Sequence, residues 1–446
     1  MVKIIFIFVI HIHNVIHRRG VRMKILKKVT LLILSFILLL NLILPATTSS
    51  AKETTTTYFT VEEFLKRLLN SSKIVINTDT QNPIIDTAIE KGIIKKGEFT
   101  NYQSYITRQD VALVVNRVDE LLHGDTYDEK LYEQITSKKR ISDLAKVSKA
   151  KQDAVVKIFL KGIMVGNSNG KCTQDRSFRG KDKLNAKEVT TILTRLNNTA
   201  KRKKLSFDGQ LIRTTDLPMN YKDFEYILAS FPNSFYEKKF LWQNATYFNR
   251  DGSVRKPVEF QDYVSPKNIR SIQFKTWDRE YDMNDILHMN LDTWIEKIKD
   301  NLEARLNVDY RYVDDKWINK LRNTYYIYNF SDMDNVSYNK IETSRIIKYV
   351  ENMKKNKVII KTETVSVEPS SLHKTPSYAM RAYVKFKIIS ANELSDQNIV
   401  IYGSDPVISD KLVKNKWIEL YIDIGIGTIE AMSIGEDYAI LHDAIW

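Results

Sequence analysis

The feature that most constrains the fold is a type of helix start that occurs three times in the first half of the chain. The three starts are residues 60–63 (Thr-Val-Glu-Glu), 107–110 (Thr-Arg-Gln-Asp) and 185–188 (Asn-Ala-Lys-Glu). In each, the first side chain can accept the backbone N–H three residues on, and the acid can reach back to the first amide, as in a capping box. Apolar residues then recur at helical spacing and predict amphipathic helices: Phe64, Leu65, Leu68, Leu69; Val111, Val114, Val115, Val118; Val189, Ile192, Leu193 and Leu196.

A second element repeats upstream of the capped helices. Residues 88–94 end in Gly92-Ile-Ile, and residues 159–164 end in Gly162-Ile-Met. A glycine at this place ends a helix easily, because it has no Cβ. One helix, loop, helix unit therefore occurs about two and a half times. The pattern predicts an all-α repeat region with a partial repeat over 52–81 and repeats over 82–139 and 140–197.

Several segments of this region resemble S-layer homology repeats. They are residues 91–94 with 106–112, and residues 141–144 with 161–164 and 184–189. The family pattern reads F-S-D-V, then A-x-x-x-G-I-I-x-G, then I-T-R-A-E-x-A. The resemblance covers roughly residues 55–197. It implies a pseudo-threefold helical prism that binds pyruvylated secondary polymer on the walls of Gram-positive bacteria.

The resemblance also indicates where such a polymer would bind. A helix N-terminus attracts anions through its free amides and its dipole, and a nearby cation reinforces the attraction. Arg108 stands where the family has its motif arginine, and Lys187 is the next candidate cation. The equivalent positions Val61 and Ala186 lack the arginine, which leaves open that the repeats serve only as a spacer. The full set of candidate ligand-binding residues is Thr60, Glu63, Thr107, Arg108, Asp110, Asn185, Lys187 and Glu188.

The N-terminus has the pattern of a secretory signal. After Met23 come Lys24, Lys27 and Lys28, then an apolar run over 29–44 and a small-residue exit that ends at Ala51. A basic region, an apolar region and a small-residue exit are the three parts of such a signal. We predict that Met23 is the true start, that residues 1–51 are removed, and that the mature chain has no stable membrane insertion.

The charge of the chain agrees with an anionic partner. The chain has 68 basic and 54 acidic residues, and its first 51 residues hold seven basic residues and no acid. The remaining net charge of +7 is a mild excess that suits an anionic wall polymer. Aromatic RNA-binding signatures are missing, so we expect no nucleic-acid partner. The single cysteine, Cys172, excludes an internal disulfide and is interpreted as a loop thiol.

Beyond the repeats the composition changes. Residues 198–207 contain Lys201-Arg-Lys-Lys204 and are interpreted as a basic linker, because adjacent like charges disfavour compact packing. All six tryptophans and 18 of the 23 tyrosines lie after Leu205. Residues 208–446 therefore form a separate domain in this interpretation.

Periodicity predicts that this second domain is α+β with an antiparallel sheet. Helices are expected over 221–230, 292–306 (capped by Asp292), 314–322 and 342–355. A hairpin is expected over 248–254 and a strand over 269–277. The remaining expected strands are 358–367, 378–389, 398–402 and 417–424.

The second domain carries no complete catalytic or metal-binding motif. A zinc His-Glu-x-x-His, a Gly-x-Ser-x-Gly elbow and a Gly-rich phosphate loop are all missing from the sequence. We therefore expect no catalytic residue, metal or cofactor. The predicted function is a secreted cell-surface protein, anchored non-covalently to secondary cell-wall polysaccharide, that displays an α+β domain. The alternative is an exported enzyme that acts on cell-wall or matrix polysaccharide, since a fold can bring two carboxylates together from distant positions.

Overall fold

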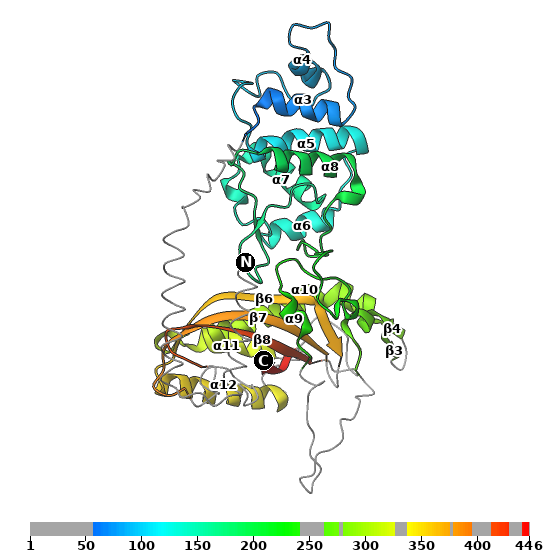
Figure 1. Cartoon of the computed structure of the whole chain (residues 1–446). Helices are drawn as coiled ribbons and strands as arrows, with labels where there is room; N and C mark the ends of the chain where they lie inside the picture. Colours follow the sequence, from blue (N-terminus) through cyan, green and yellow to red (C-terminus); the bar gives the residue numbers. More distant parts are fainter. Residues whose placement is uncertain are drawn as a thin grey trace, which may run out of the picture. The chain divides into compact units, whose positions relative to one another are not determined.

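The computed structural model describes residues 57–240, 263–275, 280–325, 337–374, 378–394, 412–427 and 439–445. The expected signal peptide, the hairpin at 248–254 and the strand at 398–402 lie outside these residues. The described chain is mixed α and β, with helices and one large antiparallel sheet (Figure 1). In the described residues, no helix combines the length and the apolar character needed to cross a membrane.

The first part of the chain is mostly helical. Its helices are α3 (Val61–Ser71), α4 (Pro83–Glu90), α5 (Arg108–His123), α6 (Glu129–Ser137), α7 (Lys149–Leu160) and α8 (Ala186–Asn197), with the 3-10 turn η1 (Leu144–Lys146). Two short strands, β1 (Asn167–Ser168) and β2 (Arg176–Ser177), pair antiparallel. The sequence predicted an all-α region. Because of these two strands, the region is not purely helical.

The three predicted helix starts are confirmed as α3, α5 and α8, whose N-caps are Thr60, Thr107 and Asn185. All twelve apolar residues that the periodicity placed on their inner faces are buried in one core. The apolar face of each helix stabilises it more than propensity alone can, because a short helix is marginal in water.

The chain segments that precede these three helices pair with one another. Isolated bridges join Tyr58 with Asn185, Thr60 with Tyr105, and Thr107 with Lys183. The Ile106 amide donates to the Phe59 carbonyl at 3.0 Å, and the Arg108 amide donates to the Asp182 carbonyl at 2.9 Å. The starts of the three capped helices therefore lie side by side.

The segment interpreted as a basic linker, residues 198–207, packs against the helices. It contains the 3-10 turn η2 (Thr199–Lys201), and Arg202 contacts the buried carboxylate of Asp119 on α5. The Lys203 amide donates to the Gly162 carbonyl at 2.9 Å. The like charges do not prevent this packing, because the buried carboxylate of Asp119 forms an ion pair with Arg202. The domain boundaries proposed from sequence, including the one at 207, remain predictions.

The next residues form short elements. The 3-10 turn η3 (Tyr221–Asp223) is the only helical structure in the predicted helix at 221–230, so that prediction is wrong. The Arg213 amide donates to the Ile227 carbonyl at 2.7 Å, and the Ala229 amide donates to the Leu211 carbonyl at 2.7 Å. Extended pairing with residues 211–213 thus takes the backbone groups that a helix would use. The following elements are α9 (Asn233–Glu237), η5 (Pro266–Ser271), β3 (Gln273–Lys275) and β4 (Glu280–Asp282). Only β3 falls in the strand predicted over 269–277.

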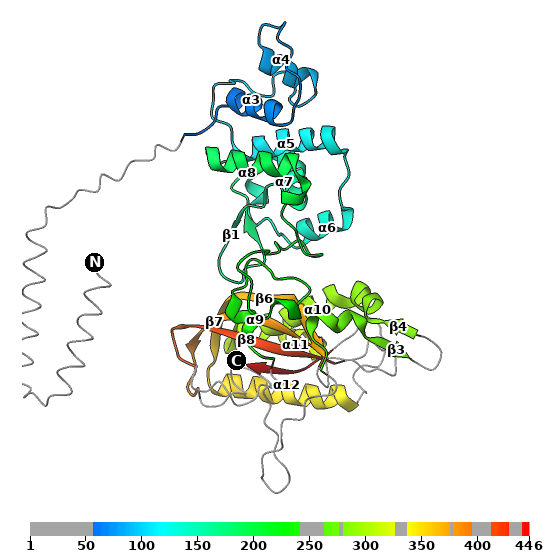
Figure 2. The same ribbon diagram turned by 45° about the vertical axis from the view of Figure 1, so that its right-hand side comes forward.

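The large sheet has five antiparallel strands in the order β5-β6-β7-β8-β9. They are β5 (Val308–Asp309), β6 (Ile359–Lys374), β7 (Tyr378–Ser390), β8 (Trp417–Gly427) and β9 (Ala439–Ile445). The helices α10 (Met283–Leu306), α11 (Asp315–Tyr325) and α12 (Ser337–Lys355), with the turn η6 (Tyr310–Tyr312), accompany it. Residues of these helices and alternate residues of β7, such as Val384 and Phe386, share one core. The views in Figures 1 and 2 agree that α11 and α12 lie on the same side of the sheet.

The predicted antiparallel α+β character is confirmed, with corrections to single elements. Helix α10 begins at Met283, because Asp282 accepts the Asp285 amide at 2.9 Å and acts as the N-cap in place of Asp292. Strand β9 was not predicted. The other face of the sheet is partly covered by residues 224–240, which form a cluster with Cys172 and Tyr383. Cys172 is therefore a core thiol, although it lies in a loop.

Candidate functional site

The paired segments before α3, α5 and α8 bring three equivalent positions together. Tyr58, Tyr105 and Lys183 each lie two residues before an N-cap. The two tyrosine side chains remain 38% and 50% exposed, and their rings are 6.0 Å apart in an edge-to-face arrangement. The Lys183 ammonium is 4.3 Å from the centroid of Tyr105 and 5.7 Å from that of Tyr58. We call these three residues the aromatic-lysine cluster.

Sequence reasoning missed this cluster, although a signal for it was present. Tyr58-Phe-Thr60, Tyr105-Ile-Thr107 and Lys183-Leu-Asn185 place a large polar side chain at the same offset from each cap. Neighbouring strand residues point to opposite faces, so residues two positions apart share a face. Because the middle residue of each triplet is apolar, the outer ones are expected to face away from the core.

Two of the predicted capping boxes are closed and use their own candidate residues. The Thr60 amide donates to Glu63 Oε2 at 2.8 Å, and the Glu63 amide donates to Thr60 Oγ1 at 3.2 Å. At α8 the Asn185 amide donates to Glu188 Oε2 at 3.2 Å, and the Glu188 amide donates to Asn185 Oδ1 at 3.0 Å. These four residues satisfy amides that a helix start leaves free.

The start of α5 is more strongly connected to the rest of the molecule. The Thr107 hydroxyl and amide donate to Asp110 Oδ2 at 2.5 Å and 3.3 Å. The other oxygen of Asp110 contacts the Lys151 ammonium on α7. Thr107 and Asp110 therefore tie α5 to α7, and the acid is already neutralised by a lysine.

Arg108, the first candidate cation, is only 6% exposed. Its Nε donates to the Phe178 carbonyl at 2.8 Å, and its Nη1 pairs with Glu188 Oε1 at 2.9 Å. Burial lowers the pKa of Arg108 below its ordinary value, and the attraction of Glu188 acts against this shift. The geometry places Arg108 between α5 and α8, where it fixes the first turn of α8.

The loop before α8 presents the exposed cations of the site. Lys181, Lys183 and Lys187 are exposed, and Arg179 is half-buried. Arg179 is within 3.4 Å of both Asp182 and Glu188. Of the two cations chosen from sequence, Lys187 is thus the one that faces solvent.

Asp143 of the Ile-Ser-Asp-Leu motif shapes this loop. Its carboxylate accepts the Phe178 amide at 2.7 Å, the Arg179 amide at 2.8 Å and the Ser177 hydroxyl at 3.0 Å. Burial raises the pKa of Asp143, but these hydrogen bonds outweigh it and hold the pKa below its ordinary value. Asp143 therefore holds Phe178 where its carbonyl meets Arg108.

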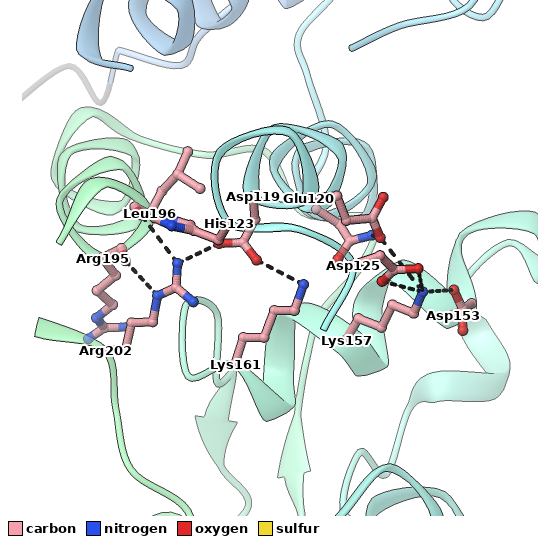
Figure 3. A network of polar contacts seen from close by, with 11 residues as sticks. Asp119, Glu120, His123, Asp125, Asp153, Lys157, Lys161, Arg195, Leu196 and Arg202 are labelled. Atoms are coloured by element: carbon pink, nitrogen blue, oxygen red, sulfur yellow. Dashed lines mark hydrogen bonds and ion pairs between the residues drawn. The ribbon is translucent and has the colours of Figure 1, made fainter. Parts of the chain in front are cut away.

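A second charged network holds the helices behind the site. Asp119 is buried, lies 2.8 Å from the Lys161 ammonium and also contacts Arg202 (Figure 3). On α7, Lys157 pairs with Asp125 at 3.2 Å, and with Glu120 and Asp153 at 3.6 Å each. A buried carboxylate is strongly disfavoured unless it is paired, so Asp119 fixes both α7 and the segment 198–207 to α5.

The described residues also contain three open clefts and no cluster of three or more residues able to bind a metal. One cleft of about 390 Å³ is lined by Asp223, Glu237, Phe224, Phe240 and Tyr263, among others. The other two, of about 360 Å³ and 520 Å³, lie along α10 and include the pairs Asp285 with Asp292 and Lys138 with Glu296.

Strand β6 carries two fully buried titratable groups, Glu368 and His373. Burial raises the pKa of Glu368 to about 8, although the Ser370 hydroxyl donates to its carboxylate at 2.8 Å. Burial lowers the pKa of His373 to about 4. Arg381 on β7 binds the buried carboxylate of Asp423 at 2.6 Å. These groups stabilise the sheet and are closed to a polymer.

Comparison with known proteins adds no name to this description. No protein-family model matches the chain, and none of the curated proteins or solved structures matches it. The geometry of the site and the sequence pattern are therefore the observations from which a function is inferred.

Proposed function

We propose that the chain is an exported protein whose helical part docks on an anionic cell-surface polymer of the secondary wall polysaccharide class. The observation that carries the proposal is the aromatic-lysine cluster, in which Tyr58, Tyr105 and Lys183 meet at the surface. The resemblance to S-layer homology repeats supports the same function and a pseudo-threefold arrangement of the three capped helices. The α+β part is then the domain displayed at the surface.

The chemistry of the cluster suits an acidic sugar polymer. An exposed tyrosine ring offers an apolar face to a sugar and a hydroxyl for hydrogen bonding. Lys183 supplies a positive charge between the two rings, and Lys187 and Arg179 extend the positive charge along the same loop. The positive end of the α8 helix dipole adds to the attraction of an acidic substituent. In this mechanism Arg108 is a positioning residue, because it holds Glu188 and the loop before α8.

The test is co-sedimentation of residues 57–446 with purified cell walls, before and after extraction of the secondary polymer. We expect retention on intact walls and its loss after extraction. Lys183→Gln should weaken retention roughly fivefold, because one charge-assisted contact is worth about 1 kcal/mol. Lys96→Gln, which removes an exposed lysine outside the cluster, is the matched control and should not change retention.

Three results would count against this proposal. Retention that survives extraction of the polymer would place the partner elsewhere in the wall. Equal loss in the Lys183 and Lys96 variants would show that only net charge matters. Absence of retention on intact walls would leave the repeats as a spacer, the reading that Val61 and Ala186 favour.

The cleft of about 390 Å³ favours a second candidate, an exported enzyme that acts on wall or matrix polysaccharide. Asp223 and Glu237 both line it, together with the rings of Phe224, Phe240 and Tyr263. Most glycosidases cleave the glycosidic bond with a pair of Asp or Glu side chains, and this cleft contains one of each. Release of reducing ends from cell walls that is lost in Glu237→Gln would support an enzyme, and activity that persists in this variant would exclude this cleft.

A further inference from the structure

A row of exposed and half-buried side chains crosses one face of the large sheet. Lys361 on β6 lies opposite Lys387 on β7, and Lys387 lies opposite Trp417 on β8. Residues directly opposite each other in a sheet share a face, so these three side chains form one row. The Lys387 ammonium is 4.6 Å from the centroid of the Trp417 ring, and that of Lys385 is 5.4 Å away.

The row is electrostatically unfavourable for the isolated protein. Like charges directly opposite each other in a sheet destabilise the pair. The nearby acids are already paired, since Glu363 binds Lys385 at 2.7 Å and Glu419 binds Lys171 at 2.6 Å. Within the described residues Lys361 and Lys387 make no ion pair. Two opposed and unneutralised lysines are therefore available to an anionic partner.

Apolar side chains are exposed beside the lysines. Ile389 follows Lys387 by two residues on β7 and so points to the same face. Ile388 pairs with Lys414, next to Val413, in the segment that leads into β8. Ile389, Val413 and Trp417 are each 40% exposed, and Lys414 and Lys416 beside them are also exposed. We call Lys361, Lys385, Lys387, Ile389, Val413 and Trp417, with the flanking Lys414 and Lys416, the basic-apolar patch.

We propose that the basic-apolar patch is a docking surface for an anionic lipid bilayer. Lysines next to an anionic membrane are attracted by its surface potential, while tryptophan and aliphatic side chains enter the boundary between headgroups and acyl chains. The positive charge of the patch favours an anionic membrane over a neutral one. The aliphatic residues set it apart from a soluble polyanion, because Ile389 and Val413 gain nothing from charged groups in water.

This surface is independent of the aromatic-lysine cluster. The patch lies on β6, β7 and the start of β8, and the cluster lies before α3, α5 and α8. Peripheral binding through a sheet face also needs no membrane-spanning helix. A chain with both surfaces contacts a wall polymer through one and a membrane surface through the other.

The test measures binding of residues 57–446 to vesicles by co-sedimentation. Residues 1–56 are omitted from the protein used, so that the apolar run in this part of the sequence does not bind lipid itself. We expect binding to vesicles of equal parts phosphatidylglycerol and phosphatidylcholine, and at least tenfold weaker binding to phosphatidylcholine alone. Lys361→Gln with Lys387→Gln should lower the partition coefficient about 25-fold, since each lysine near an anionic surface contributes about a factor of five. Trp417→Ala should lower it about tenfold.

The matched control is Lys66→Gln with Lys96→Gln, which removes the same charge at two exposed positions outside the sheet. It should leave the partition coefficient within a factor of two. Equal binding to both kinds of vesicle, or equal loss in the two double variants, would overturn the proposal. Binding of a soluble wall polysaccharide that falls in the Lys361 and Lys387 variant, without vesicle binding, would assign the patch to a sugar polymer and would also overturn it.

Discussion

At the scale of single residues, most of the motif side chains make contacts within the protein, and only a few of them face solvent. Arg108 and Asp143 belong to two different motif segments. Both side chains form hydrogen bonds with the backbone of the loop that contains Phe178 and Arg179. Tyr58, Tyr105 and Lys183, which are also exposed to solvent, lie just outside the motifs. A pattern of motif residues can therefore specify a binding surface without contributing to it directly.

Removal of the Arg108 side chain is expected to destabilise the fold. Arg108→Ala removes the Nε donor of the buried Phe178 carbonyl and leaves Glu188 with Arg179 alone, and an unsatisfied buried acceptor costs about 1–3 kcal/mol. Urea unfolding followed by circular dichroism measures the change. Lys187→Ala, at an exposed position in the first turn of α8, should change the unfolding free energy by less than about 0.5 kcal/mol. A neutral Arg108→Ala would contradict the positioning role.

The pKa of Glu368 predicts how stability depends on pH. In the folded chain burial keeps this carboxyl protonated up to about pH 8, while in the unfolded chain it ionises near 4.5. The unfolding free energy should therefore fall as pH rises from 4.5 to 8, by at most about 1.4 kcal/mol per pH unit from this group. Glu368→Gln should flatten the dependence in this range. Asp208, which raises the same pKa, Ser370 and Tyr236 are unchanged in that variant.

His373 acts in the opposite direction. Burial lowers its pKa from 6.5 to about 4, so the unfolded chain takes up the proton first as pH falls. Its contribution to stability should be lost between pH 6.5 and 4. His373→Phe, which keeps a ring stacked on Phe240 at a centroid distance of 3.7 Å, should remove that loss. An unchanged acid limb in this variant would show that other groups control it.

At the scale of elements, two equivalent glycines differ in what surrounds them. Gly92 and Gly162 both have a positive φ, 69° and 68°. A Cβ on Gly92 would meet nothing within 4 Å, whereas one on Gly162 would lie 1.9 Å from the Lys203 carbonyl oxygen. Position 92 therefore needs glycine for its backbone conformation alone, and position 162 needs it for close packing as well.

Alanine substitutions separate these two requirements. Gly92→Ala should destabilise by about 1–2 kcal/mol, because a positive φ is unfavourable for an L-residue. Gly162→Ala should destabilise by about 2 kcal/mol more and loosen the segment 198–207, since this segment must move away. Unfolding free energies and proteolysis at residues 201–204 measure both effects. Equal effects of the two substitutions would contradict the packing described for Gly162.

The sequence predicted those elements whose signals are local. The capped helices α3, α5 and α8 and the long strands β6, β7 and β8 have a regular apolar period, and all were anticipated. The prediction of a helix at 221–230 was wrong because part of this segment forms backbone hydrogen bonds with residues 211–213 in an extended conformation. A local sequence pattern does not reveal such pairing. Residues 198–207 were predicted to be a linker that does not pack. The prediction failed because Asp119, which forms an ion pair with Arg202, lies 83 residues earlier in the chain.

The candidate site was predictable to a similar degree. The caps were found because a capping box is confined to four residues. The burial of Arg108 and the meeting of Tyr58, Tyr105 and Lys183 depend on pairing between three distant segments. Such pairing follows from the folded arrangement and not from any single repeat.

At the scale of the whole molecule, Cys172 joins the loop between β1 and β2 to the cluster that covers the sheet. Its thiol is buried, and burial raises its pKa to about 12. Native protein should therefore react with a thiol reagent at least about 100-fold more slowly than unfolded protein. Since the chain has a single cysteine, the rate of labelling reports the opening of this contact. Fast labelling of native protein would contradict the packing of the loop.

The central claim is that the aromatic-lysine cluster binds an anionic wall polymer, and a titration of purified secondary polymer into residues 57–446 tests it most directly. Calorimetry should show saturable binding for the unaltered chain and for the Lys96→Gln control. Tyr58→Ala with Tyr105→Ala should weaken binding at least tenfold while circular dichroism and the unfolding free energy stay close to those of the unaltered chain. Unchanged affinity in this folded double variant would contradict the account.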